Sequence, residues 1–535
     1  MQADYVADYV VVGAGSAGCT VAARLAETGA SVILLEAGPR DTHPMIHIPA
    51  GVRSLIRHPV VNWNFTTEPE KSSGERRIDW PRGRTLGGSS SINGMLYVRG
   101  APADFDGWAQ MGCRGWSWDE VLPFFMKSEQ YAQGGDASVR GQSGPLKVED
   151  YRTILPLTHR FVEGAQQAGF PFNPDLNGKQ RYGVGYSQMT RRGRWRGSTA
   201  QTYLREARRL PNLKVETDAQ AGKLLFEGKR CIGASFRRGG NLTEVRANRE
   251  VIVAGGAVNS PHILQISGIG PAAHLQSLGI PVVHDLPGVG ANLIDHYVVR
   301  VVHRVHGAET MNQIARFPRV LPEVLRFAFT GRGALTFGVT AAQVFCDSRE
   351  GLASPDLQLL FTPGSSHPVK FGELDELPGM SCVVCVVKPD SRGTIMASSA
   401  DPFARPAIHP NYLSTRTDEV ALLSGIEKVR RIFAAPALSQ HSTGEIQPGP
   451  DLKSEADLLA YARRAGNTLY HPVGTCKMGE DPRAVVDSRL RVHGLQGLRV
   501  IDASVMPTLT TGNTNAPTIM IGEKGAAMIR EDAAA

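Results

Sequence analysis

The sequence predicts an α/β fold (α+β overall) in which a Rossmann-like domain is interleaved with a second domain built on an antiparallel β-sheet. Three observations predict it. A glycine fingerprint at Gly13 to Gly18 follows a β-branched run at residues 8–12. Strand-like runs that resemble later parts of such a domain recur at residues 249–254 and 498–502. The stretch at about 300–460 lies between these recurrences, and 535 residues exceed one ordinary core, so this stretch forms a second, inserted domain.

The first unit of the Rossmann-like domain is a strand, a turn, a helix and a second strand. Residues 8–12 are the first strand, helical apolar spacing follows Gly18, and residues 31–36 form the second strand. A right-handed crossover makes the two strands parallel. In this context Gly13 permits the tight turn, Gly15 lets a pyrophosphate approach the backbone, and Gly18 lets the helix pack on the strand. The carboxylate of Glu36 ends the second strand, where it can accept hydrogen bonds from both hydroxyls of a ribose.

The inserted stretch contains two expected strands and one expected helix. Leu357–Phe361 and Cys382–Val387 are strand-like, and Asp418–Ile432 has helical apolar spacing. Cys382 and Cys385 have CxxC spacing, but positions i and i+3 of a strand face opposite sides. The seven scattered cysteines therefore predict buried free thiols in a reducing compartment, with no redox pair and no metal site.

Composition excludes several classes of protein. The chain is 42% hydrophobic and 20% charged, as in a soluble globular protein. It contains no uninterrupted run of about 18 apolar residues, which argues against a membrane span. The start at residues 1–5 lacks the pattern of a signal peptide, so we expect the cytoplasm. A net charge of +7 without a recognisable module argues against nucleic acid as a partner.

One stretch indicates a peripheral contact with the inner membrane. Basic and apolar side chains alternate there, as at an anionic membrane surface. Pro318 and Pro322 are expected to interrupt any long helix in this stretch. The residues are Arg316, Arg319 and Arg326 with Phe317, Leu321, Leu325 and Phe327.

Two further segments carry chemistry. The run from Arg82 to Met95 is too rich in glycine and serine for a core element, and it reads as a loop pressed against a ligand. Near the end of the chain, His471 supplies an imidazole, whose ordinary pKa of about 6.5 suits proton transfer near neutral pH. A chain that folds both ends around one cofactor is expected to be a redox enzyme.

Together these segments resemble the glucose–methanol–choline (GMC) oxidoreductase family of FAD enzymes. The resemblance spans essentially the whole chain, in the family's order, and implies an FAD domain with a substrate domain whose antiparallel sheet roofs the flavin. We expect the FAD domain at 1–155, 210–298 and 462–535, and the substrate domain at 156–209 and 299–461. The matching motifs are Gly13 to Gly18 with Glu36, Gly87 to Gly94, Gly256 to Gly270, His471 to Thr475, and Asp502 to Thr518.

The resemblance also assigns cofactor residues. Some family members tether FAD through a histidine where this chain has Ile92, so dissociable FAD is expected. The ADP part falls on Gly13, Gly15, Ser16, Ala17, Gly18, Glu36 and Ala37, with Ala221 facing adenine. The flavin and ribityl part falls on Gly88, Ser89, Asn93, Gly94, Met95, Leu96, Asp502, Ala503, Pro517 and Thr518.

His471 and Asn515 match the family's catalytic pair. The resemblance implies FAD-dependent oxidation of a primary alcohol to the aldehyde, with His471 removing the hydroxyl proton while the carbon gives a hydride to flavin N5. An amide at Asn515 would hold the alkoxide oxygen without titrating. The helix expected to start at Asn515 would point its positive end at the flavin. Tyr470 and Phe337 are candidates for lining the substrate cavity, with core packing as the alternative for both.

Alternatives stay open at this point. The chain could be a choline dehydrogenase, an alcohol oxidase that uses oxygen, or a cyanohydrin lyase of the kind that retains FAD. A dehydrogenase is favoured by analogy, because peroxide made in the cytoplasm would be released inside the cell. Its electron acceptor would be a quinone, a dye or oxygen. The sequence sets neither the alcohol nor the oligomeric state.

Overall fold

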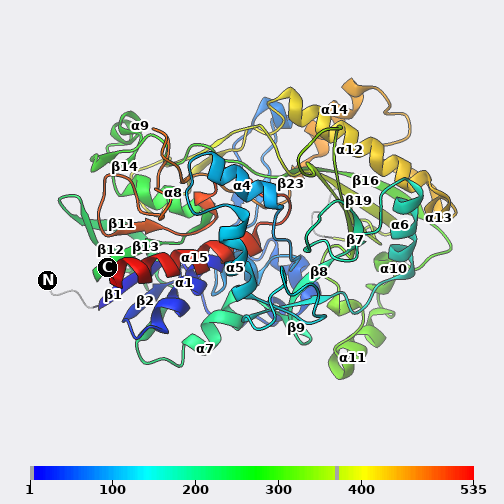
Figure 1. The fold of residues 1–535 in the computed structure, drawn as a ribbon. Coiled ribbons are helices and arrows are strands. Elements are labelled where there is room, and N and C mark those ends of the chain that lie inside the picture. Colours follow the sequence, from blue (N-terminus) through cyan, green and yellow to red (C-terminus); the bar gives the residue numbers. More distant parts are fainter. Residues whose placement is uncertain (1–4, 368–372, 535) are drawn as a thin grey trace.

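The structure, a computed structural model, describes residues 5–367 and 373–534. Two large sheets lie at opposite ends of the molecule (Figure 1). Helix α15 (Asn515–Ala534) runs from the middle of the molecule to the end that also holds the first strand, β1 (Tyr5–Val12). The first described strand and the last described helix therefore belong to the same half of the protein.

The first sheet has the order β10-β2-β1-β13-β12-β11, with β24 against β13. Strand β1 lies between β2 and β13 and runs parallel to both, as the sequence predicts for the first βαβ unit. Strands β12 and β11 pair antiparallel at one side of this sheet. Because its parallel part is covered on both faces, Val10, Val11 and Val12 are all buried. The strands are β1 (Tyr5–Val12), β2 (Val32–Leu35), β10 (Leu213–Glu216), β11 (Gln220–Glu227), β12 (Arg230–Arg238), β13 (Asn241–Val253) and β24 (Leu498–Val500).

The second sheet has the order β22-β16-β19-β18-β17-β7, with β23 against β16, and its strand pairs are antiparallel. Helices α6 (Pro156–Gln167) and α12 (Arg416–Ala434) pack against it. The predicted fold class is confirmed, as are the two strands and the helix predicted in the insertion. The strands are β7 (Gly183–Tyr186), β16 (Tyr297–Val305), β17 (Ala342–Cys346), β18 (Leu357–Thr362), β19 (Gly379–Val386), β22 (Ser442–Gln447) and β23 (Asn467–Thr468).

A smaller sheet connects the two halves. It contains β5 (Glu129–Tyr131), β6 (Leu146–Asp150), β8 (Gln188–Arg192) and β9 (Trp195–Arg196). Strands β6 and β8 pair across residue 155, where the sequence predicts a domain boundary. The exact domain boundaries stay a prediction.

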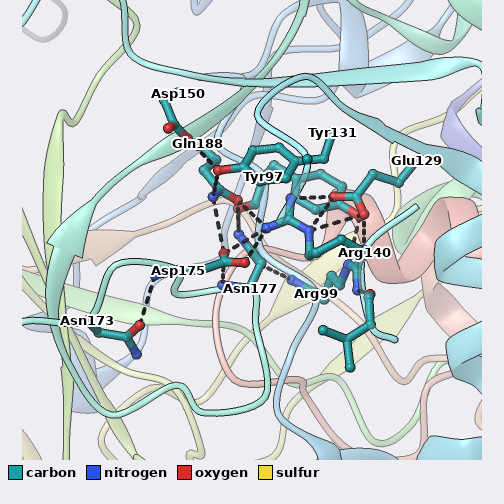
Figure 2. A network of polar contacts seen from close by, with 12 residues as sticks. Tyr97, Arg99, Glu129, Tyr131, Arg140, Asp150, Asn173, Asp175, Asn177 and Gln188 are labelled. Atoms are coloured by element: carbon teal, nitrogen blue, oxygen red, sulfur yellow. Dashed lines mark hydrogen bonds and ion pairs between the residues drawn. The ribbon is translucent and has the colours of Figure 1, made fainter. Parts of the chain in front are cut away.

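A buried network of charged side chains fixes this small sheet to the segments around it (Figure 2). The carboxylate of Glu129 is fully buried and pairs with both Arg99 and Arg140, and Arg140 Nη2 donates to Glu129 Oε1 over 2.6 Å. Arg140 also pairs with Asp175 at 2.7 Å and lies over the ring of Tyr131, 3.7 Å from its centre. Each arginine in this network therefore has a carboxylate partner, which is what a buried charge requires.

The ends of the chain meet along two helices. Helix α1 (Ser16–Ala26) packs on α15, and Arg24 pairs with the buried Glu523 at 2.7 Å. At the start of both helices, Ser16 Oγ donates to Asn515 Oδ1 over 2.8 Å, although the two residues are 499 positions apart. This contact closes the fold where the nucleotide fingerprint lies.

The structure also shows how the cysteines pack and whether any described helix could span a membrane. Cys382 and Cys385 are free and buried, and they pack into two different apolar clusters on opposite sides of β19. Across residues 5–367 and 373–534, no helix is long and apolar enough to cross a membrane. The same residues contain no group of histidine, cysteine and acidic side chains that could hold a metal ion.

Candidate functional site

A cavity of about 710 Å³ extends from the turn after β1 to the inner face of the second sheet. Most of the residues predicted for cofactor and substrate line it. Three predicted residues, Gly18, Pro517 and Phe337, do not line it. Those that do are Gly13, Gly15, Ser16, Ala17, Glu36, Ala37, Gly88, Ser89, Asn93, Gly94, Met95, Leu96, Ala221, Tyr470, His471, Asp502, Ala503, Asn515 and Thr518.

The turn after β1 requires its glycines for space. Gly13 has φ +106, and a Cβ there would meet the Ala254 carbonyl oxygen at 2.5 Å. A Cβ on Gly18 would meet the Gly13 oxygen at 1.8 Å, so Gly18 serves helix packing and not direct contact with a ligand. A Cβ on Gly88 would meet Gly15 Cα at 2.7 Å, so the glycine-serine loop lies directly on the fingerprint. The two motifs thus form one cradle for a nucleotide.

Glu36 and Asp502 are the acidic side chains of this cradle. Glu36 accepts hydrogen bonds from the backbone N–H groups of Ala14 (3.1 Å) and Gly38 (2.9 Å), and burial raises its pKa to about 7. Hydroxyl donors from a ribose would favour the ionised carboxylate there. Asp502 accepts from Gly256 N (2.8 Å) and Ser260 Oγ (2.6 Å), which ties the end of β24 to helix α8 (Gly256–Ile266). Both positions fit the sugar and ribityl parts of FAD.

The segment after the glycine-serine loop is held in an unusual conformation. Met95 has φ +63, a region that costs a non-glycine residue free energy. Its N–H donates to Asn93 Oδ1 over 3.0 Å, and Arg196 Nη1 donates to the same oxygen over 2.8 Å. The buried Arg196 therefore fixes the backbone of residues 93–96 at the cavity wall.

Ile92 lies in the cavity wall at the point where a covalent link to FAD would form. Its side chain has no atom that can make such a bond, so we expect FAD to dissociate when the protein is denatured. Acid precipitation should leave the yellow colour in the supernatant, in a ratio of one flavin per chain. Colour that stays in the washed pellet would contradict this expectation.

The loop that carries His471 is braced by a buried carboxylate. Asp295 accepts from the backbone N–H of His471 over 2.8 Å, from Thr468 Oγ1 over 2.6 Å, and from the Tyr412 hydroxyl. Between them Tyr470 adopts φ +69, and its N–H donates to Thr468 Oγ1 over 2.7 Å. This strained turn directs the imidazole of His471 into the cavity.

Hydrogen bonds assign the protons of the His471 ring. His296 Nε2 lies 3.2 Å from the Val387 carbonyl, which only accepts, so this nitrogen carries the proton. In neutral His296 the Nδ1 atom is then an acceptor, and it lies 2.9 Å from His471 Nδ1. His471 Nδ1 must therefore donate, which leaves His471 Nε2 unprotonated. An unprotonated ring nitrogen of this kind is what a general base needs to accept a proton.

Electrostatics keep both histidines neutral. Burial lowers the pKa of His296 to about 3. Burial, together with the nearby His296 and Arg82, lowers the pKa of His471 well below its usual range. A protonated ring at either position would have to exist without a carboxylate in contact. His471 is therefore ready to accept a proton at neutral pH.

The asparagine that contacts His471 in the structure is Asn513, and the catalytic pairing of His471 with Asn515 stays a prediction. Asn513 Nδ2 lies 3.2 Å from His471 Nε2, so its amide points at the lone pair. The amide of Asn515 instead accepts from Ser16 at the first turn of α15. The place where α15 begins explains the difference. Asn515 is the first residue of the helix and contacts Ser16 in the nucleotide turn, whereas Asn513 lies in the preceding loop and contacts His471.

The two residues predicted to line the substrate cavity, Tyr470 and Phe337, lie in different places in the structure. Tyr470 lines the cavity, and burial raises the pKa of its hydroxyl well above its usual range. Phe337 is buried in an apolar cluster and packs edge-on against Tyr151, with the ring centres 5.8 Å apart. Phe337 therefore does not line this cavity in the structure, and core packing, the alternative given for it, accounts for its position.

Three residues of the site escaped the sequence analysis. These are Asp295, His296 and Asn513. Asp295 and His296 directly precede strand β16, where a polar pair at a strand end is a recognisable signal. Nothing in the sequence separates Asn513 from Asn515, because both lie in the same short polar segment.

Comparisons with known proteins agree with this geometry. Two family models described as GMC oxidoreductase match residues 7–298 and 389–522. The alcohol dehydrogenase (acceptor) of Pseudomonas putida is 41% identical over 532 residues, which cover 98% of this chain and 95% of the relative. The human mitochondrial choline dehydrogenase is 41% identical over 535 residues, covering 98% of this chain and 89% of that protein.

A solved structure shares the whole fold. The crystal structure of pyridoxine 4-oxidase from Mesorbium loti superimposes with a TM-score of 0.89 at 30% identity, covering 98% of this chain and 99% of the other. These matches confirm the resemblance drawn from the motifs and, with it, FAD as the cofactor. The chain belongs to the GMC oxidoreductase family.

Proposed function

We propose that the protein oxidises a primary alcohol to the aldehyde with FAD, and that His471 is the base. The observation that carries the proposal is the unprotonated Nε2 of His471, which faces the cavity beside an amide donor. Bound FAD supplies the acceptor for the hydride that leaves the alcohol carbon. His471 Nε2 takes the hydroxyl proton, so the alcohol loses one proton and one hydride in total.

Asn513 completes the proposed catalytic pair. Its Nδ2 atom can donate a hydrogen bond to the alcohol oxygen as negative charge develops there, and an amide does so without titrating. Asn515 has a different task in the proposal, because its contact with Ser16 holds the start of α15 against the nucleotide turn. The positive end of that helix then favours negative charge on the reduced cofactor.

Anaerobic mixing with alcohols tests the reaction class. An oxidising enzyme should lose its visible flavin absorbance when a primary alcohol is added without oxygen. A cyanohydrin lyase would leave the absorbance unchanged with every alcohol, and that result would overturn the proposal. A panel of primary, secondary, aromatic, sugar and amino alcohols would show which class reduces the flavin fastest.

We infer that the electron acceptor is not oxygen. The support is the similarity to a relative named alcohol dehydrogenase (acceptor), although other relatives are named oxygen-dependent choline dehydrogenase. Steady-state rates with a dye acceptor should exceed those in air-saturated buffer. Peroxide release that matches the dye rate would identify an oxidase.

The proposed location is the cytoplasm, peripheral to the inner membrane. Seven free, buried cysteines fit a reducing compartment. Helix α11 (Val320–Thr330) projects from the edge of the molecule (Figure 1), and Phe317 and Phe329 beside and within it are each 80% exposed. Leu321, Val324 and Leu325 are exposed as well.

The charges around α11 suit an anionic lipid surface. Arg316, Arg319 and Arg332 are exposed, and the acidic residue of the helix, Glu323, is paired with Arg326 at 3.0 Å. Pro318 lies in the break between α10 (Met311–Ile314) and α11, as predicted, whereas Pro322 lies in the first turn of α11, where proline is tolerated and does not interrupt the helix. Phe327 is buried and does not belong to the exposed surface.

We expect the protein to sediment with vesicles that contain phosphatidylserine and to release from them at high salt. Replacing both Phe317 and Phe329 with serine should weaken vesicle binding by about 10-fold or more, since two large apolar groups leave the lipid. Leu242→Ser, at a 67% exposed residue in the β12–β13 hairpin, is the matched control. Wild-type protein that stays in the supernatant would contradict the membrane contact.

A further inference from the structure

The charges that line the cavity are distributed unevenly. Among the described residues that line it, the acidic side chains are Glu36 and Asp502, and both lie in the cradle for the nucleotide and the ribityl chain. The wall toward the second sheet is basic and polar. It includes Arg53, Arg76, Arg82, Arg300 and Arg464, together with Thr362, Ser381, Gln447 and Asn467.

Two of these arginines, Arg76 and Arg82, donate hydrogen bonds to backbone carbonyls. Arg76 Nη2 donates to the carbonyls of Arg463 (2.9 Å) and Gly466 (2.7 Å). Arg82 Nη2 donates to the carbonyl of Tyr470 over 2.5 Å, which helps to hold the turn before His471. Their guanidinium groups therefore have structural partners, which fixes their place in the wall.

Arg53 and Arg300 differ from them. Neither side chain makes a hydrogen bond or an ion pair within residues 5–367 and 373–534 of the structure. Arg53 comes from the short helix α3 (Val52–Leu55) and is partly buried. Arg300 comes from β16 and is exposed, although it lines the cavity. Side chains alternate along a strand, so Arg300 shares its face with Val298, which packs with Leu96 near the flavin end of the cavity.

The two guanidinium groups act on each other. Burial and the positive charge of Arg300 lower the pKa of Arg53 to about 10, so Arg53 remains charged at neutral pH. The Arg300 charge also acts on the hydroxyl of Tyr470, the residue before His471. Both cations line the same cavity and repel each other, no carboxylate of the described lining lies outside the nucleotide cradle, and a bound anion would relieve the repulsion.

We propose that Arg53 and Arg300 form an anion subsite in the substrate part of the cavity, and that the preferred alcohol carries a carboxylate or phosphate remote from its hydroxyl. This inference rests on the proposed alcohol oxidation. A guanidinium pair binds either anion through charge-assisted hydrogen bonds. The same pair repels a quaternary ammonium, because the described lining offers no carboxylate to receive it outside the nucleotide cradle. Choline is therefore a poor substrate of this chain.

Matched substrates test the subsite. We would compare kcat/KM, with a dye acceptor, for ω-hydroxycarboxylates, ω-hydroxyalkyl phosphates, 1-alkanols of the same chain lengths, and choline. Wild-type enzyme should prefer one of the anionic series, and the better series identifies the anion. A preference for the 1-alkanol or for choline at every chain length would overturn the proposal.

Variants show whether the arginines cause the preference. Arg53→Met and Arg300→Met should each lower kcat/KM for the anionic alcohol by about 10- to 100-fold, the loss expected for a charge-assisted hydrogen bond, mainly through KM. Their kcat/KM for the matched alkanol should stay within a few-fold of wild type. Arg57→Met is the control, because Arg57 lies beside α3 but is exposed and paired with Asp79. Equal losses for both substrates would refute a role in recognition.

A charge reversal separates recognition from folding. Arg300→Glu should retain its flavin and shift the preference toward choline and amino alcohols. If that variant binds FAD but keeps the wild-type order of substrates, the subsite is wrong. If no alcohol reduces the flavin of the wild-type enzyme, the proposed function fails instead, so the two failures are distinguishable.

Discussion

His471→Ala is expected to lower the rate of anaerobic flavin reduction by an alcohol by about 10²- to 10⁴-fold, with FAD still bound. The variant removes the one nitrogen that the hydrogen bonds through His296 leave free to accept the hydroxyl proton. The substitution should leave the loop in place, because Asp295 accepts its hydrogen bond from the backbone N–H of residue 471 and not from the side chain. Stopped-flow absorbance measures the rate, and the flavin-to-protein ratio checks cofactor binding. Wild-type rates in this variant would exclude His471 as the base.

Two signatures distinguish this base from a merely structural histidine. Burial and nearby positive charge hold the pKa of His471 well below its usual 6.5. The reduction rate should therefore stay constant through pH 6.5 and fall only at lower pH, where the ring becomes protonated. Asn513→Ala should slow reduction while FAD stays bound, because its amide faces Nε2. Asn515→Ala should weaken FAD binding more than it slows reduction, because its partner is Ser16.

Glu129→Ala is expected to destabilise the fold by about 3–5 kcal/mol, the usual cost of leaving buried charges without their partner. Both Arg99 and Arg140 lose a carboxylate in a region where all three side chains are fully buried. Arg140 keeps Asp175, but Arg99 then has no acidic partner among the contacts described. Urea unfolding followed by fluorescence and flavin absorbance measures the loss.

The control for this prediction is an exposed ion pair. Glu163 pairs with Arg160 at 2.8 Å, with about half of each side chain exposed, so Glu163→Ala should change stability by at most about 1 kcal/mol. Equal effects of the two substitutions would mean that the network around Glu129 is not a source of stability. Glu129→Gln, which keeps the shape but not the charge, should lie between them.

The residues predicted for the nucleotide half of the site lie together in the structure because that half is local. Gly13, Gly15 and Glu36 belong to one short strand-turn-helix-strand unit, so their spacing alone fixes what they face. The fold class follows from the same kind of pattern, repeated along the chain. Sequence spacing does not say which way a single side chain points, and tertiary packing decides it. The ring of Phe337, for example, points into the core.

The catalytic half was harder because its parts come from distant segments. The choice between Asn513 and Asn515 depends on where α15 begins relative to the histidine loop, and no local pattern fixes that point. His296 acquires its role only when β16 and the histidine loop meet. Arg53 and Arg300 each read as an ordinary surface arginine, and only the folded cavity brings their charges together.

The clasp between Ser16 and Asn515 has a consequence for biosynthesis. A ribosome releases the glycine fingerprint long before α15, and β1 cannot pair with β13 until the middle of the chain has been made. Such long-range pairings raise the contact order, which slows folding and prolongs the exposure of apolar strands. The nascent chain therefore lacks the contact between Ser16 and Asn515 until α15 has been translated. Cofactor capture is expected to be a late, post-translational step, and the supply of free FAD at that moment to decide how much chain reaches the folded state.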